Sequence, residues 1–302
     1  VASIANETGF TSAGYFCRKF RQYYNRSPKE YRKKKTEETE PEKRHLTEPK
    51  AEETKQGLKK TRTGERNEMA DMQKAFEEVR NMLSGEQSGH GFDHVERVYR
   101  LALELAEKEG ADKEIAGLAA LLHDCDDYKL AGEEAAEKLP NARRILTIAG
   151  ANDDMREKVL NIVARMGYSK SLKGIRPLSL EGKVVSDADM LDAIGVGGII
   201  RCLQYAVVRC NAFGTPLFDP DVWPEPGLSA EEYKRPNRKS DNFINHFFEK
   251  LLKLKGMMMT ASAREEAEIR HRAMTDFLYH FFRERKLAEW SAYLDAYLSG
   301  GQ

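Results

Sequence analysis

Helical spacing of apolar residues dominates this chain from about residue 68 to its end. Met69, Met72, Phe76 and Val79 form one stripe, and other stripes follow at 95–106, 115–122 and 159–166. A period of three to four residues is typical of amphipathic helices, and no convincing run alternates as a half-buried strand would. We therefore expect residues 68–302 to form an all-α domain.

The same pattern predicts the longer helices of this domain. They cover about 180–212 and 241–255, then 263–285 after Thr260 as N-cap, and finally 287–298. Residues 214–240, rich in proline and glycine, predict a long ordered or lid-like loop.

Two further segments precede this domain. Residues 1–34 combine helical apolar positions with a basic surface and predict a small helical unit. Residues 35–67 carry many charges and few apolar side chains, so burial cannot offset the entropy of ordering them. We interpret 35–67 as a disordered charged linker.

Composition excludes several classes of protein. The 302 residues include 40% hydrophobic and 32% charged side chains, with a formal net charge of zero. The four cysteines form no C-x-x-C pair, which favours reduced thiols over disulfides, and no apolar run approaches the roughly 20 residues of a membrane span. We expect a cytoplasmic protein, and the valine at position 1 suggests a fragment.

Four ionisable side chains stand where apolar helices end or bend: His94, the pair His123-Asp124, and Asp187. Buried carboxylates are costly unless they are paired or bind a metal, so the run LAALLHD points to a functional site. Two imidazoles and two carboxylates suit one Mn²⁺, Mg²⁺, Fe²⁺, Co²⁺ or Ni²⁺ ion and leave positions for water and substrate. We therefore predict a metal-dependent phosphohydrolase.

Other side chains, most of them near these four in the sequence, are candidates for catalysis or substrate binding. Asp127 could orient or deprotonate a water and Lys129 could contact phosphate, although a solvated loop acid and an exposed lysine are the alternatives. The candidates for substrate binding are His90, Arg97, Asp192, His246 and Lys250. Asp192 could instead hold a metal ligand in place, and His246 could be an ordinary core histidine. Gly195, Gly197 and Gly198 follow no strand, so they predict close helix packing and not a dinucleotide site.

The segment 70–298 resembles the HD-domain phosphohydrolase superfamily, whose pattern is H…HD…D. Four blocks carry the resemblance in order: HGFDHVERV, ALLHDCDDYK, VSDADMLDAIG and NHFFEKLLKLKGMMMT. It implies a helical bundle with a metal held by His94, His123, Asp124 and Asp187. Some members of one similar subgroup cleave nucleoside triphosphates to the monophosphate and pyrophosphate. Several relatives have a histidine where this chain has VARMGYSKS, which bears on substrate preference or a second metal contact.

The first 34 residues resemble the closing half of an AraC-type helix-turn-helix DNA-binding domain. The match rests on A-x-x-x-G-F-x-S…Y-F-x-R-x-F…S-P-x-x-Y-R, and it implies DNA-facing positions at Ser12, Ala13, Tyr15, Arg18 and Lys19. Two alternatives to an enzyme with a DNA-binding appendage follow. One is a transcription regulator whose HD domain senses a nucleotide, and the other is a fusion of unrelated modules.

Overall fold

The computed structural model describes residues 70–84, 91–127, 132–235, 238 and 240–300. The chain divides into a unit Val1–Thr63 and a unit Gly64–Gln302, and the description below concerns the second. The predicted helical unit at 1–34, its five DNA-facing residues and the linker at 35–67 lie outside the described residues. His90 and Lys129 also lie outside them.

Within the described residues, all regular structure is helical, as the periodicity predicted. The first half comprises α4 Met72–Met82, α5 Phe92–Glu109, α6 Lys113–Leu122, α8 Glu133–Lys138, α9 Pro140–Ile148, α10 Asp153–Ala164 and α11 Tyr168–Leu172. The second half comprises α12 Leu180–Asp192, α13 Gly195–Phe213, α14 Ala230–Lys234, α15 Asn245–Glu249, the 3-10 helix η1 Leu251–Met257, α16 Ala261–Glu284 and α17 Ala288–Leu298.

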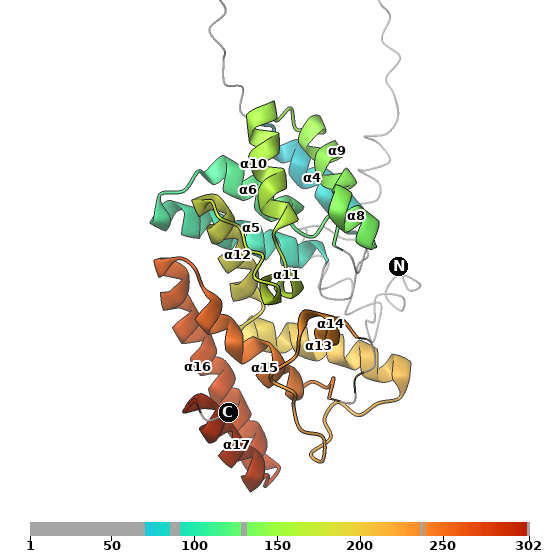
Figure 1. Ribbon diagram of the computed structural model, residues 1–302, viewed down its shortest axis with the longest axis vertical. Helices are drawn as coiled ribbons and strands as arrows, with labels where there is room; N and C mark the ends of the chain where they lie inside the picture. The colour runs from blue at the N-terminus through green and yellow to red at the C-terminus, as the bar shows by residue number, and fades with distance from the viewer. Residues whose placement is uncertain (1–69, 85–90, 128–131, 236–237, 239, 301–302) are drawn as a thin grey trace, which may run out of the picture. The chain divides into compact units, whose positions relative to one another are not determined.

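Helix α6 lies at the centre of the bundle. Every residue from Ile115 to Leu122 is buried, as expected for a helix that is apolar on all sides. Helices α5, α12, α10 and α4 pack around it (Figure 1). Asp112 caps its first turn by accepting hydrogen bonds from the backbone N–H groups of Glu114 and Ile115. The central helix therefore delivers its C-terminal residues directly into the core.

Two helix predictions need correction. The helix expected over 180–212 is two helices, α12 and α13, bent by 66° at their junction. Gly195 at the junction has a φ of +77°, a left-handed conformation that side chains with a Cβ rarely adopt. The helix expected over 241–255 is the short α15 followed by η1. The predicted loop 214–240 also contains α14.

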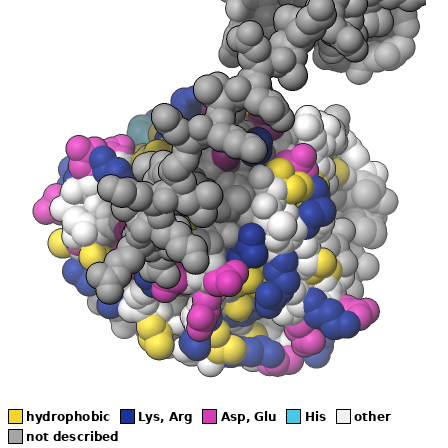
Figure 2. Space-filling model, turned by 90° about the horizontal axis from the view of Figure 1, so that it is seen from above, with side chains coloured by type: hydrophobic (Ala, Val, Ile, Leu, Met, Phe, Trp, Pro, Cys, Tyr) yellow, Lys and Arg dark blue, Asp and Glu magenta, His cyan; other side chains and the backbone are white. Residues whose placement is uncertain are grey.

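The visible face of the domain in Figure 2 shows Lys and Arg side chains interspersed with Asp and Glu, with hydrophobic side chains scattered among them. This agrees with the zero formal net charge of the chain. Within the described residues no single helix is both long and apolar enough to cross a bilayer, and α12 with α13 meets that test only as a bent pair.

Candidate metal centre and cavity

His123 is the C-cap residue of the central helix α6, and its ring is buried. Its Nδ1 lies 2.7 Å from the carbonyl oxygen of Ala120, so Nδ1–H donates to that oxygen. The hydrogen bond fixes the tautomer and leaves Nε2 with a lone pair. His123 thus presents one unprotonated nitrogen to the centre of the bundle.

His94, in the first turn of α5, is only 2% exposed and is fixed in the same way. Its Nδ1 lies 2.7 Å from Oδ2 of Asp192, at the end of α12. Its Nε2 lies 3.2 Å from Nε2 of His123. Two lone pairs at this distance repel each other unless a cation, either a proton or a metal ion, lies between them.

Two carboxylates complete the group. Oδ2 of Asp124 lies 3.4 Å from Nε2 of His94 and 3.5 Å from Nε2 of His123. Oδ1 of Asp189 lies 3.5 and 3.9 Å from the same two nitrogens. Ligand atoms about 2.1 Å from one ion lie roughly 3.0–4.2 Å from one another, so these distances fit a single mixed nitrogen and oxygen site.

Asp189, and not Asp187, faces the two histidines, which corrects the predicted ligand set. The donor atoms of His94, His123 and Asp189 all lie within 4.8 Å of one another. The Asp187 carboxylate, fully buried, accepts hydrogen bonds of 2.7–3.0 Å from the backbone N–H groups of Met259 and Thr260 and from the Thr260 hydroxyl. Burial raises the pKa of Asp187 despite these hydrogen bonds. Asp187 therefore anchors the start of α16, where exposed N–H groups favour an acceptor.

Helical geometry explains why Asp189, and not Asp187, faces the two histidines. Residues two apart on a helix face different directions, whereas residues three apart share a face. Asp192 and Asp189 are three apart, and both contact the ring of His94. Had the pairing of Asp192 with His94 been known, this spacing would have selected Asp189.

Asp192 holds His94 and does not reach into the cavity. Its carboxylate also accepts from Nε and Nη2 of Arg97 at 2.7 and 3.1 Å, and from Arg201 at 3.4 Å. Burial opposes its ionisation, but His94 and Arg97 outweigh this and hold the pKa of Asp192 well below its usual range. Of the two roles considered for Asp192, the structure supports fixing a metal ligand, and it places Arg97 on the same carboxylate.

The charges of the centre are strongly coupled. Burial lowers the pKa of His94, but hydrogen bonds with Asp124, Asp189 and Asp192 outweigh it and raise the pKa to about 10. Burial likewise opposes ionisation of Asp189, yet the two histidines lower its pKa to about 2. Without a metal, the cluster therefore holds a proton on His94 against an excess of carboxylates, and this is an environment that favours a divalent cation.

A cavity of about 520 Å³ opens beside this centre. His123, Asp124 and Asp189 line one end, and Asp127 lies with them. The other walls carry cationic and aromatic side chains: Lys170, Arg201, Arg209, Arg235, Arg238, Lys250, Tyr168, Tyr205, Tyr233 and His246. The cavity thus joins a cluster of metal-type ligands to a cationic wall.

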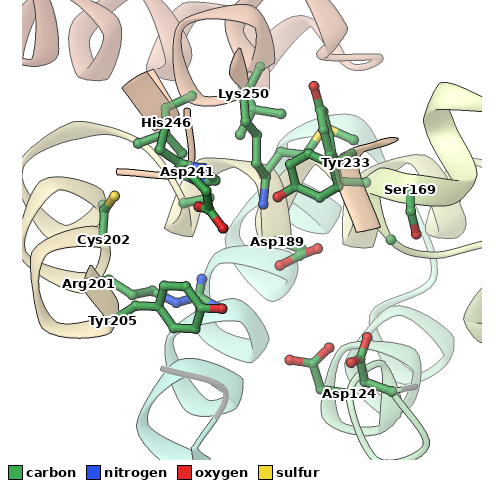
Figure 3. A pocket seen from close by; sticks show the side chains of 18 of the residues that line it. Asp124, Ser169, Asp189, Arg201, Cys202, Tyr205, Tyr233, Asp241, His246 and Lys250 are labelled. Carbon is green, nitrogen blue, oxygen red and sulfur yellow. The ribbon is translucent and has the colours of Figure 1, made fainter. Parts of the chain in front are cut away.

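Figure 3 shows how the cations lie relative to the carboxylates. The ammonium of Lys250 points toward Asp189, and Arg201 projects from α13 into the same space. Lys250 Nζ also lies 5.1 Å from the ring centroid of Tyr168. Burial lowers the pKa of Lys250, and the charge of Arg201 adds to that effect.

The aromatic side chains gather in one part of the cavity wall. The rings of Tyr168 and Tyr233 pack edge to face with centroids 5.0 Å apart, and Tyr233 stacks on His246 at 6.5 Å. His246 and Lys250, predicted from their spacing of four, both line the cavity. Sequence analysis did not select Asp189, although it lies in the VSDADMLDAIG block. It also missed Arg201, Lys170, Tyr168 and Tyr233, because these residues reach the cavity only through the fold.

Family comparisons agree with this geometry. The family model described as "HD domain" matches residues 91–194, which contain all four candidate ligands. The model described as "Bacterial regulatory helix-turn-helix proteins, AraC family" matches residues 1–33. Among curated proteins, the chain is 37% identical over 201 residues to the uncharacterized protein YpgQ of Bacillus subtilis, covering 66% of this chain and 86% of YpgQ.

Several solved structures are also similar to this chain. A Lactobacillus plantarum protein is 35% identical with a TM-score of 0.59, and the match covers 73% of this chain and 97% of that one. An HD-superfamily hydrolase from Bacillus thuringiensis is 34% identical with a TM-score of 0.53, covering 71% and 96%. Bacillus subtilis YpgQ, solved in complex with ADP, is 31% identical with a TM-score of 0.52, covering 69% and 97%.

Proposed function

We propose that this chain, which belongs to the HD-domain superfamily of metal-dependent phosphohydrolases, hydrolyses a phosphoanhydride bond of a nucleotide. The observation that carries the proposal is that the group His94, His123, Asp124 and Asp189 contributes three of its members to the lining of a cavity with a cationic wall. Hydrolysis of a polyphosphate requires both features, because charge accumulates on phosphate oxygens in the transition state.

His94, His123, Asp124 and Asp189 would hold one divalent ion. When bound, such an ion polarises a phosphate oxygen and makes a neighbouring water more acidic. The protein's part is to fix the four donors: Ala120 and Asp192 orient the two rings, and Arg97 orients Asp192.

The cationic side chains bind and orient the phosphate groups in this proposal. Lys250 and Arg201 reach the space beside Asp189 from two different elements. Together they would neutralise the phosphates nearest the centre, and Lys170 on α11 would extend the cationic wall away from it. Asp127 remains our candidate to accept a proton from the attacking water, since it lines the same cavity as Asp124.

A nucleotide fits the rest of the cavity better than a small phosphate ester does. The volume of about 520 Å³ lies within the roughly 300–1,000 Å³ of small-molecule sites. Tyr168, Tyr233 and His246 offer aromatic faces to a base. The ADP complex of the similar YpgQ supports a nucleotide as the ligand class.

A hydrolysis screen with nucleoside triphosphates and added Mn²⁺, Mg²⁺ or Co²⁺ tests the proposal, with separate detection of orthophosphate and pyrophosphate. We expect pyrophosphate, which marks cleavage of the bond between the α- and β-phosphates. Lys250→Met should lower kcat/KM by at least about tenfold, because it removes a desolvated cation facing phosphate. Lys255→Met is the matched control, since Lys255 pairs with Glu268 outside the cavity. Equal effects of the two variants, or hydrolysis that needs no metal, would refute the proposal.

A second function, DNA binding by residues 1–33, is favoured by the match to the AraC-family model. Ser12, Ala13, Tyr15, Arg18 and Lys19 are the proposed contacts. In this case the HD domain would sense a nucleotide for a transcription regulator. Binding to duplex DNA should weaken steeply with salt, and Arg18→Ala with Lys19→Ala should flatten that dependence. Absence of salt-dependent binding would exclude this function for the chain.

A further inference from the structure

Helix α13 reverses the usual arrangement of a surface helix. Its arginines turn inward, where Arg201 pairs with Asp192 at 3.4 Å and Arg209 pairs with Asp241. Among its described side chains, the exposed ones include none that is charged: Val196, Gly197, Ile200, Leu203, Gln204, Tyr205, Val207, Val208 and Asn211. Surface helices normally place charges on the solvent side, so this face needs an explanation.

The apolar residues on this face follow a regular seam. Val196, Ile200, Leu203 and Val207 are separated by four, three and four residues, which is the spacing of an interhelical seam. They are 63%, 53%, 39% and 38% exposed, and Val208 beside them is 55% exposed. Leaving a continuous apolar stripe of this kind in water is unfavourable, so the seam indicates a partner helix.

We propose that the partner is a second copy of this chain, and that two α13 helices pack antiparallel across a two-fold axis. The four seam residues lie symmetrically about the midpoint between positions 201 and 202. In an antiparallel pair centred there, Ile200 faces the partner's Leu203 and Val196 faces the partner's Val207. A surface that matches its own inverted copy is what a two-fold interface requires.

The chemistry of the face also favours a second copy over a different protein. Because the exposed side chains described on α13 carry no charge, two copies of this helix meet without like-charge repulsion. Apolar, charge-depleted cores are typical of homodimer interfaces.

The interface would also support the cavity. Arg201, Cys202, Ala206 and Arg209 on the inner side of α13 line the cavity wall. In Figure 1, α13 extends away from α4, α6, α9 and α10. A partner helix would hold this wall from outside. The proposal stands on the surface of α13 and does not depend on the substrate of the enzyme.

Sedimentation velocity of the full chain, over a range of concentrations, tests the proposal. We expect a dimer for the wild type and an approximately 100-fold weaker association for Leu203→Glu, since each dimer contains the substitution twice. Ile148→Glu is the matched control, because Ile148 is 39% exposed, as Leu203 is, and lies on α9, which packs on α4 and α10. Circular dichroism should show unchanged folding for both variants, as both positions are exposed in the protomer.

A mixing experiment tests the register. Ile200→Lys and Leu203→Glu should each be monomeric alone, and an equal mixture should dimerise, because the two changed positions face each other across the pair. A monomeric wild type would overturn the proposal, as would a dimer that Leu203→Glu leaves intact or that Ile148→Glu disrupts equally. A mixture that stays monomeric would overturn the antiparallel register.

Discussion

His94 combines two roles in one ring. Its Nδ1–H is committed to Asp192, while its Nε2 faces His123 at 3.2 Å and two carboxylate oxygens at 3.4 and 3.5 Å. In the metal-free protein the carboxylates raise its pKa to about 10 despite burial. A metal ion must therefore displace a proton from Nε2 before it can bind there.

This competition predicts that metal affinity rises with pH. Because His94 is protonated below about pH 10 in the metal-free protein, binding releases one proton throughout the neutral range. The apparent dissociation constant for Mn²⁺ should fall roughly tenfold for each unit of pH between about 6 and 8. Isothermal titration calorimetry in buffers of different ionisation enthalpy would measure the released proton. A pH-independent affinity would show that His94 is not a ligand.

Asp187 and Asp189 provide a second test among single residues, because the two variants should fail in different ways. Asp189→Asn should reduce the rate of hydrolysis at least about 100-fold, which is more than the loss typical for a residue that only hydrogen-bonds to a metal ligand. In the presence of a chelator, its thermal stability should equal that of the wild type. Asp187→Asn should lower the free energy of unfolding by about 1–3 kcal/mol, because an amide cannot accept all the hydrogen bonds from Met259 and Thr260. Thermal unfolding and Mn²⁺ titration of both variants would separate these effects. Loss of metal binding in Asp187→Asn alone would restore the original assignment.

At the scale of the helices, the site depends on where three of them begin or end. His123 is the C-cap of α6, His94 lies in the first turn of α5, and α12 ends at Asp192. The donors therefore meet at the ends of three helices. Sequence periodicity predicted α5 and α6 because their apolar stripes are long and regular. It could not separate α12 from α13, because the apolar pattern continues across the break and only the tertiary fold uses the left-handed Gly195.

Sequence periodicity also could not decide which carboxylate of the D-A-D triplet faces the histidines. Asp187 and Asp189 stand two residues apart on one helix, and the sequence contains no local sign of which of them faces α5. The pair His123-Asp124 was predictable because an entirely apolar helix leads into it. Cavity residues such as Arg201 and Tyr168 were not, because elements distant in sequence bring them together.

The junction of α12 and α13 gives a prediction for these elements. A Cβ at Gly198 would lie 2.3 Å from the carbonyl oxygen of Ala193, whereas a Cβ at Gly197 would meet nothing within 4 Å. Gly198→Ala should therefore lower the free energy of unfolding by about 1–3 kcal/mol. Gly197→Ala should leave it unchanged or raise it by up to about 1 kcal/mol, since alanine favours helix. Urea unfolding of both variants would measure these free energies. Equal stabilities would mean that the helices do not approach closely at Gly198.

For the whole molecule, the four candidate ligands and the cavity lie within the unit Gly64–Gln302. Residues 1–33, which match the AraC-family model, lie outside the described residues. A chain of residues 64–302 should therefore keep kcat/KM within about twofold of the full chain, as expected for a domain with its own core. Steady-state kinetics on both chains would check this. A large loss of activity would show that the first unit takes part in catalysis.

The most direct test of a single metal centre driving phosphohydrolysis is a Mn²⁺ titration of the full chain, followed by electron paramagnetic resonance and by the initial rate of nucleotide hydrolysis. We predict that bound metal and rate rise together and level off at one ion per chain, and that His123→Ala abolishes both. A rate independent of Mn²⁺, or full metal binding by His123→Ala, would contradict the account.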